Sequence, residues 1–272
     1  MPGLLSAEHL KARAIRIGAN DQINFGLIGC KGMGWSNMHS HLRIPEVNCV
    51  ALADVDQSVL DQRSEDVYKL RGKRPKQYKD YRLMLEDPDI DAVIIGTPDH
   101  WHCLNLIDSL SAGKHAYTEK PLANSIEECN LMVKAADRYG KLVQVGQWQR
   151  SGSQYEQAIA MVKSGKLGNI RLVKTWAYQG WMNPVPQLPN SQPPAGVDYK
   201  MWLGPAPDRP FNANRFHFNF RWFWDYAGGL MTDWGVHEID IALYAMGVSA
   251  PKSIMASGGK LAYPDDASET PD

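Results

Sequence analysis

The chain of 272 residues is long enough for about two domains of roughly 150 residues each, and it carries a net charge of −1. Hydrophobic residues make up 44% and charged residues 22% of it, which excludes wholesale disorder and a fibrous repeat. The balanced charge disfavours nucleic acid and anionic membranes as partners, and no stretch approaches the ~20 apolar residues of a membrane-spanning helix.

Residues 1–22 contain no hydrophobic run like that of a secretory leader, so we expect a short N-terminal extension and a cytoplasmic protein. Alternatively, residues 4–7, Leu-Leu-Ser-Ala, are the remnant of a trimmed leader and the protein is exported. The four cysteines form no CxxC pair, so neither a disulfide framework nor a zinc cluster is expected.

From residue 23, short β-rich runs alternate with helical stretches, a pattern typical of a doubly wound parallel sheet. The predicted strands lie at 23–28, 47–53, 92–97, 115–118 and 142–145. The predicted helices between them lie at about 33–43, 56–70, 100–112 and 125–139. Ser125 and Glu128 form a capping box at the start of the last helix. Together these elements predict an α/β first domain at residues 23–148.

The pattern changes in the second predicted domain, residues 149–272. A helix is predicted at about 153–164, a strand at 171–178 and a second helix at about 233–246. Between them, positions 184–210 hold eight of the 17 prolines, which predicts an irregular loop. Six of the nine tryptophans lie beyond residue 150; they either pack in the core or, as we consider for Trp222, stack on a sugar ring.

Glycines at the end of the first strand predict a pyrophosphate site, because a helix N-terminus offers free backbone N–H groups. Gly29 and Gly34 match the first and third glycines of the G-x-G-x-x-G spacing. Lys31 occupies the second glycine position, while Gly32 and Met33 complete the turn.

Asp54 ends the second strand, where a carboxylate can accept hydrogen bonds from the adenosine ribose. Its charge repels a 2′-phosphate and no arginine follows at 55–57, so NAD is favoured over NADP. A turn-capping aspartate is the alternative.

Further polar residues follow the fourth and fifth strands. In open α/β sheets ligands bind beyond the carboxyl ends of the strands, so we expect these residues to border the cofactor: Thr97, Pro98, His102, Glu119 and Lys120. His100 and His102 lack a third ligand spaced nearby, so no metal is expected. Lys120 is suited to stabilise a developing alkoxide, although a surface lysine is the alternative.

Asp233 and His237 stand four apart on the second predicted helix of that domain and therefore share a face. An imidazole oriented by a carboxylate is suited to accept a hydroxyl proton, although such pairs are more often structural. Asp240, three residues further on, can reach the same ring or a substrate.

These motifs resemble the Gfo/Idh/MocA family of NAD(P)-dependent sugar and cyclitol oxidoreductases. The matching residues stand in the family's order: Gly29-x-x-Gly32-x-Gly34, Asp54, Thr97-Pro98 with His102, Glu119-Lys120-Pro121, Val145-Gly146 with Arg150, and Gly228-Gly229-x-x-x-Asp233-x-Gly235-x-His237-x-x-Asp240. The resemblance implies a Rossmann domain followed by an α/β domain whose open, largely antiparallel sheet makes homo-oligomer contacts. It also implies a cis peptide before Pro121. Since relatives continue well beyond residue 266, we expect the second domain to be truncated and its sheet incomplete.

The activity implied is hydride transfer between NAD and a secondary alcohol of a sugar, glycoside or cyclitol. Lys120, Asp233 and His237 would be catalytic, and Arg150 and Trp222 would join them in binding substrate. Two alternatives stay open: a glycosidase that recycles NAD through transient sugar oxidation, and a nonenzymatic NAD-binding sensor or subunit.

Overall fold

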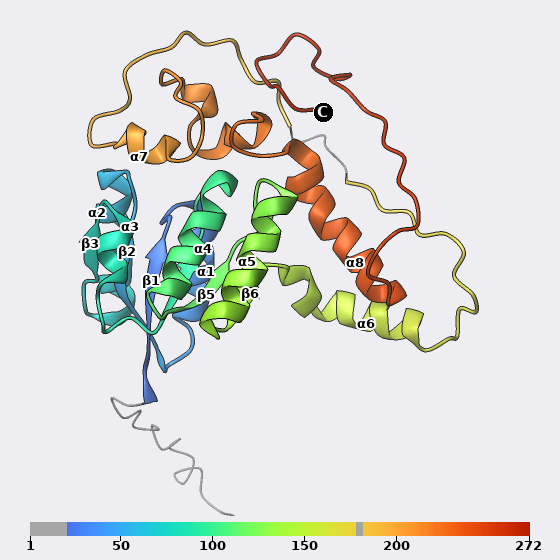
Figure 1. Ribbon diagram of the computed structural model, residues 1–272, viewed down its shortest axis with the longest axis horizontal. Helices are drawn as coiled ribbons and strands as arrows, with labels where there is room; N and C mark the ends of the chain where they lie inside the picture. Colours follow the sequence, from blue (N-terminus) through green and yellow to red (C-terminus); the bar gives the residue numbers. More distant parts are fainter. Residues whose placement is uncertain (1–20, 178–181) are drawn as a thin grey trace, which may run out of the picture.

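The computed structural model describes residues 21–177 and 182–272, so the predicted extension at 1–22 lies almost entirely outside it. A parallel sheet of six strands forms its centre, in the order β3-β2-β1-β4-β5-β6 (Figure 1). The strands are β1 (Ile23–Ile28), β2 (Val47–Ala53), β3 (Lys76–Tyr78), β4 (Ala92–Ile95), β5 (His115–Thr118) and β6 (Val143–Val145). Five correspond to the predicted strands, and β3 was not predicted.

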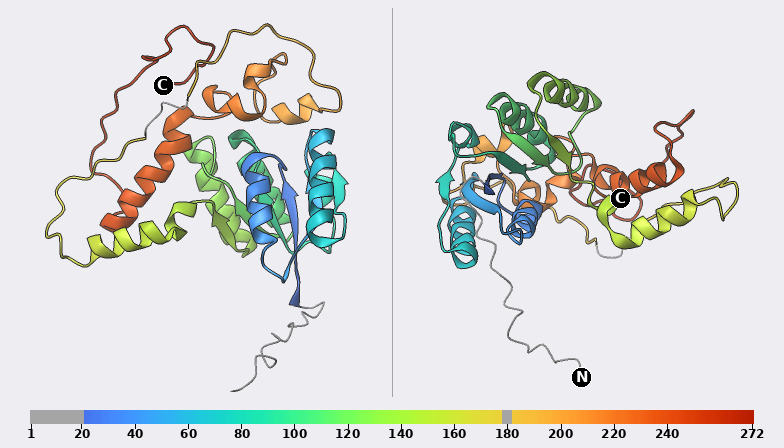
Figure 2. Two further views of the ribbon diagram at one scale, coloured as in Figure 1. Left: turned by 180° about the vertical axis from the view of Figure 1, so that it is seen from behind. Right: turned by 90° about the horizontal axis from the view of Figure 1, so that it is seen from below.

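Helices cover both faces of this sheet (Figure 2). They are α1 (Gly32–His41), α2 (Gln57–Arg71), α3 (Tyr81–Leu85), α4 (His102–Ser111) and α5 (Ile126–Tyr139). Leu27, Leu52 and Ile94 pack with α1 and α2, whereas Ile28, Val93 and Ile95 pack with α3, α4 and α5. Burial on both faces explains the continuous apolar runs of the central strands. The capping box of Ser125 and Glu128 opens α5 as predicted.

The second unit lies beside and above this sheet. α6 (Ser153–Lys163) packs along α8 (Val236–Met246) next to β6, and α7 (Tyr199–Leu203) lies over the edge where the strands end (Figure 1). A π-helical turn, Met231–Gly235, leads into α8. An aromatic cluster holds the segment around α7 together: Trp202, Phe211, Phe216, Phe220, Trp222, Phe223 and Tyr226.

The predicted second sheet is not formed among the described residues. Residues 171–177 of the predicted strand at 171–178 have no regular secondary structure, and position 178 lies outside the described residues. A strand exists only where another strand hydrogen-bonds to it, whereas this segment stands apart and leaves Leu172 83% exposed. The homo-oligomer contact expected through that sheet therefore stays a prediction.

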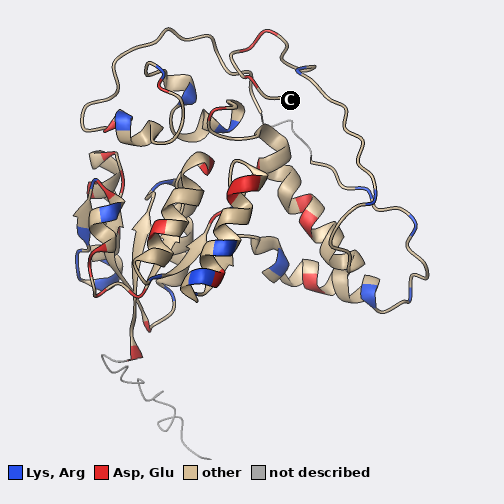
Figure 3. Ribbon diagram, viewed as in Figure 1, with Lys and Arg blue, Asp and Glu red and all other residues tan. Residues whose placement is uncertain are grey.

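Lys and Arg residues are interspersed with Asp and Glu residues along both units (Figure 3), consistent with the balanced composition. In the described part of the chain, no helix has both the length and the apolar character needed to cross a bilayer.

Candidate active site

The first βα turn packs against the end of β4 so closely that side chains are excluded. A Cβ on Gly34 would lie 2.0 Å from the carbonyl oxygen of Gly29, and one on Gly96 would lie 2.4 Å from Cα of Gly34. Lys31 caps α1 with φ −101° and ψ 166°, an extended conformation open to any residue. The lysine at the second glycine position is therefore compatible with the phosphate-binding turn.

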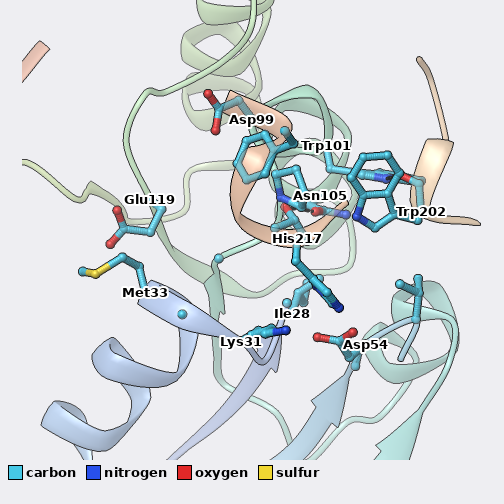
Figure 4. Close-up of a pocket in the computed structure, with 18 of the residues that line it drawn as sticks. Ile28, Lys31, Met33, Asp54, Asp99, Trp101, Asn105, Glu119, Trp202 and His217 are labelled. Carbon is cyan, nitrogen blue, oxygen red and sulfur yellow. Dashed lines mark hydrogen bonds between the residues drawn. The ribbon is translucent and has the colours of Figure 1, made fainter. Parts of the chain in front are cut away.

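A cavity of about 470 Å³ opens above this turn, between the strand ends and the segment 217–221 (Figure 4). Its volume falls within the range of about 300–1,000 Å³ typical of small-molecule sites. The structure brings eight of the predicted site residues to its wall: Gly29, Gly32, Met33, Asp54, Thr97, Pro98, Glu119 and Lys120. Gly34 lies beneath them in the turn.

Asp54 caps the turn, which is the alternative interpretation, and it also lines the cavity where the ribose contact is predicted. Its carboxylate accepts the backbone N–H of Cys30 at 2.7 Å and that of Asp56 at 3.0 Å, so it does cap the turn. Each oxygen keeps a lone pair for a ribose hydroxyl. Burial raises the pKa of Asp54, and the backbone N–H groups oppose that effect.

The charges at the Asp54 end of the cavity suit a dinucleotide. Lys31, Arg63 and Lys79 line it, and their positive charge complements a pyrophosphate. Towards the other end, Asn37 on α1 donates to Glu119 Oε1 at 2.5 Å and so fixes that carboxylate at the wall.

His102 lies behind the cavity and does not line it. Its buried ring contacts the carbonyl oxygen of Pro121 through Nδ1 at 2.7 Å and that of Thr97 through Nε2 at 2.8 Å. Burial lowers its pKa. The peptide before Pro121 is cis, as the resemblance implies. His102 thus ties two cavity loops together and lies outside the cavity wall, where direct contact with the cofactor is predicted.

Lys120 and Asp233, 113 residues apart, meet at the edge of the cavity. Lys120 Nζ donates to Asp233 Oδ1 at 2.6 Å and to the Asp233 carbonyl oxygen at 2.7 Å. Arg221 Nε also donates to Oδ1, at 3.3 Å. Burial alone would raise the pKa of Asp233, but the two cations outweigh it and the pKa is lowered. The carboxylate is therefore held in its ionised form.

His237 lies near this pair without joining it by a hydrogen bond. The π-helical turn around Asp233 changes the spacing that would have placed both side chains on one α-helical face. Within the described residues, Nδ1 of His237 has no hydrogen-bond partner, and the ring packs edge-on against Trp148 at 5.6 Å. Burial and the charge of Lys120 lower its pKa to about 4. Asp233 therefore contacts Lys120 directly, and the structure shows no hydrogen bond between Asp233 and His237.

Two predicted substrate contacts lie away from the cavity wall. Arg150 forms a bidentate pair with Asp240 on α8, at 2.7 and 2.5 Å. Trp222 is 3% exposed and belongs to the aromatic cluster, so its faces are closed to a sugar. Phe218, which is exposed and lines the cavity, offers the aromatic surface instead.

The sequence predicted no chemical role for three residues at the cavity wall: Asp99, Arg221 and His217. Asp99 follows Thr97 and Pro98 beyond β4, a position that could have singled it out. Burial raises its pKa to about 7, Asp233 adds to that shift, and Arg221 and Lys120 oppose it. Two carboxyls with opposite pKa shifts thus stand around Lys120, an arrangement suited to acid–base chemistry.

Comparison with known proteins agrees with this geometry. Residues 23–147 match the family model described as an oxidoreductase family with an NAD-binding Rossmann fold. Residues 170–257 match the model described as the C-terminal alpha/beta domain of an oxidoreductase family.

Among curated proteins, glycosyl hydrolase family 109 protein 1 of Shewanella sp. (strain ANA-3) is 33% identical over 152 residues. An alpha-N-acetylgalactosaminidase of Shewanella oneidensis is 32% identical, also over 152 residues. Each match covers 54% of this chain and only 33% of the relative's length.

Among solved structures, scyllo-inositol dehydrogenase from Lactobacillus casei, with bound NAD(H) and scyllo-inositol, is 26% identical with a TM-score of 0.50. That match covers 54% of this chain and 43% of the dehydrogenase. The WlbA dehydrogenase from Bordetella pertussis, in complex with NADH and UDP-GlcNAcA, shares the fold with a TM-score of 0.65 and 20% identity. That match covers 92% of this chain and 65% of the WlbA chain.

Proposed function

The chain belongs to the Gfo/Idh/MocA family of NAD-binding oxidoreductases, and from that membership we propose that it oxidises a secondary alcohol on a sugar, glycoside or cyclitol. The observation that carries the proposal is the Lys120–Asp233 pair, held at 2.6 Å beside a cavity fitted to a dinucleotide.

The residues that would hold NAD line one continuous wall. The N-terminus of α1 and the glycine turn would take the pyrophosphate, Asp54 the adenosine ribose, and Glu119 the nicotinamide end. When bound, NAD supplies the acceptor for the two electrons that leave the alcohol carbon.

Lys120 would bind the alcohol oxygen. An ammonium group has three N–H donors, and Asp233 occupies two of them through its carboxylate and its carbonyl oxygen. The third is available to the cavity that Lys120 lines. A hydrogen bond from an ammonium group stabilises negative charge as it develops on the alcohol oxygen.

Two groups near Lys120 are able to take the alcohol proton. His237 has its pKa lowered to about 4, so it is neutral at physiological pH and free to accept. Asp99 lines the cavity itself, and its pKa of about 7 lets it exchange a proton there. We retain His237 as the proposed acceptor because it belongs to the motif shared with the family, and Asp99 is the competing group.

A second candidate function is favoured by the two Shewanella relatives, whose names describe glycoside hydrolases. In this alternative a hydroxyl-bearing sugar carbon would be oxidised transiently, the neighbouring C–H would become acidic, and the glycosidic bond would be eliminated. Water would then add to the resulting double bond, and return of the hydride to the ketone would restore both the hydroxyl and the cofactor. Asp99 could then exchange protons with the neighbouring carbon or the leaving oxygen.

One experiment separates these functions. Purified protein loaded with NAD is offered cyclitols, free sugars and p-nitrophenyl glycosides, while reduced nicotinamide and released nitrophenol are recorded together. Accumulating reduced nicotinamide supports the dehydrogenase, and nitrophenol release without net reduction supports the recycling glycosidase. Lys120→Met should abolish either signal, whereas Lys134→Met, on the exposed side of α5, should leave it unchanged. Binding of NAD with no chemistry across the panel would instead support the nonenzymatic alternative.

A further inference from the structure

The second unit returns to the nucleotide-binding loop and pairs with it directly. Asp56, in the loop after β2, forms an antiparallel bridge with Val197. Two backbone hydrogen bonds flank this bridge, from Gln57 to Gly196 at 3.2 Å and from Asp198 to Val55 at 2.9 Å. The loop that carries the ribose-binding Asp54 is therefore fastened to the segment 196–198.

His217 makes a second connection to the same loop. Its Nε2 lies 3.3 Å from Asp56 Oδ2. Among the described residues it is the one non-glycine residue with a positive φ, at +54°. Such a backbone is strained for a residue with a side chain, and it persists only where its surroundings hold it.

The imidazole reaches into the cavity from the side opposite the strands. His217 lines the cavity, and Figure 4 shows its ring pointing toward Lys31 and Asp54. These two residues mark the pyrophosphate and ribose ends of the adenosine half. A dinucleotide that joins them would have to pass beneath the ring.

We propose that His217 is a cofactor-binding residue supplied by the second unit, and that it closes the groove over the adenosine half of NAD. The inference rests on the proposed function, because it requires NAD in this groove. One ring nitrogen is turned to Asp56, and the Phe216 ring centroid lies 3.8 Å from that of His217, which leaves the other nitrogen and the remaining ring face for the nucleotide. NAD then leaves only after the His217–Asp56 contact opens, so its exchange is slow.

The test measures release of NAD and binding of its two halves. Wild type, His217→Ala and His217→Asn are loaded with NAD, and its release is followed after mixing with an excess of etheno-adenine NAD. Asparagine tolerates the left-handed backbone, so it removes the imidazole while keeping the turn. ADP-ribose and nicotinamide mononucleotide are then titrated separately by calorimetry.

Both variants should release NAD about tenfold faster and bind ADP-ribose about tenfold more weakly, as expected for loss of one good contact. Binding of nicotinamide mononucleotide should not change. Asn219→Ala, in the same turn but outside the cavity wall, serves as the matched control and should behave as wild type. Asp56→Asn, which weakens the contact without touching the ring, should give an intermediate release rate.

Wild-type release rates in both histidine variants would overturn the inference and leave the proposed function standing. Equal weakening of both halves would also overturn it, because it would indicate a general loss of structure. Failure of wild type to bind NAD would overturn the proposed function itself, and this inference with it.

Discussion

The pair of Lys120 and Asp233 should behave as one energetic unit. Nζ and Oδ1 are 2.6 Å apart, and the side chains are only 11% and 13% exposed. Removing one partner of such a pair leaves a buried charge without its counter-ion, which costs about 3–5 kcal/mol. Asp233→Ala should lie at the upper end of that range, because it also deprives Arg221 of its carboxylate.

Lys120→Ala should cost less, about 3 kcal/mol, because Arg221 still neutralises Asp233. The double variant should lose no more than Asp233→Ala alone, which amounts to a coupling energy of about 3 kcal/mol. Urea unfolding followed by tryptophan fluorescence gives all three free energies. Glu65→Ala, which breaks the exposed pair with Arg74, is the control and should cost about 1 kcal/mol or less.

Additive losses in the double variant would refute this reasoning, since they would mean that the two charges do not stabilise each other. The reasoning would also be refuted if Asp233→Ala lowered the free energy of unfolding by no more than the control Glu65→Ala does.

Three further predictions concern the turn, the core and the proton chemistry. Gly34→Ala should weaken NAD binding at least tenfold in calorimetry, because its Cβ would lie 2.0 Å from a carbonyl oxygen. The Cβ of Gly32→Ala would meet nothing within 4 Å, so this variant should lose only about 1–2 kcal/mol of folding stability, because Gly32 has a positive φ. Burial lowers the pKa of His100 to about 4, so the unfolded chain binds a proton at this residue more readily than the folded chain does. This residue should therefore lower the free energy of unfolding by about 2 kcal/mol as the pH drops from about 7 to about 5. His100→Asn should remove that contribution when unfolding is measured as a function of pH. If Asp99 accepts the substrate proton, turnover should rise with pH through its pKa of about 7, and Asp99→Asn should abolish that rise in a pH–rate profile.

Each of these has a clear contrary result. Equal NAD affinity in the two glycine variants would mean that the turn can open at little cost. An unchanged pH dependence in His100→Asn would place the titrating group elsewhere, and an unchanged profile in Asp99→Asn would leave the proton to His237.

Much of the nucleotide-binding unit follows from local sequence. Strands such as β4 are apolar along their whole length because both faces are covered, so the run itself marks the strand. β3 escaped prediction because Lys76, Gln77 and Tyr78 form a three-residue strand at the sheet edge, without an apolar run. The glycine turn was predictable because close backbone approach admits no other residue.

The catalytic region was less accessible because its geometry depends on long-range packing. No local pattern brings Lys120 to Asp233; the family resemblance alone pointed to that meeting. The π-helical turn has no sequence signature here, so the spacing of Asp233 and His237 was read as α-helical. Trp222 shows the same limit, because composition cannot distinguish an enclosed tryptophan from one that faces a ligand.

Because of the π-helical turn, the geometry of the site depends on the number of residues in the turn as well as on which side chains are present. An α-helix advances by about 100° per residue, so deleting Trp234, between Asp233 and His237, would turn the carboxylate to a different side relative to the imidazole on α8. The lysine, aspartate and histidine would all survive such a deletion while their meeting point disappeared. For homologous sequences, counting the residues between the aspartate and the histidine is therefore as informative as finding the three side chains.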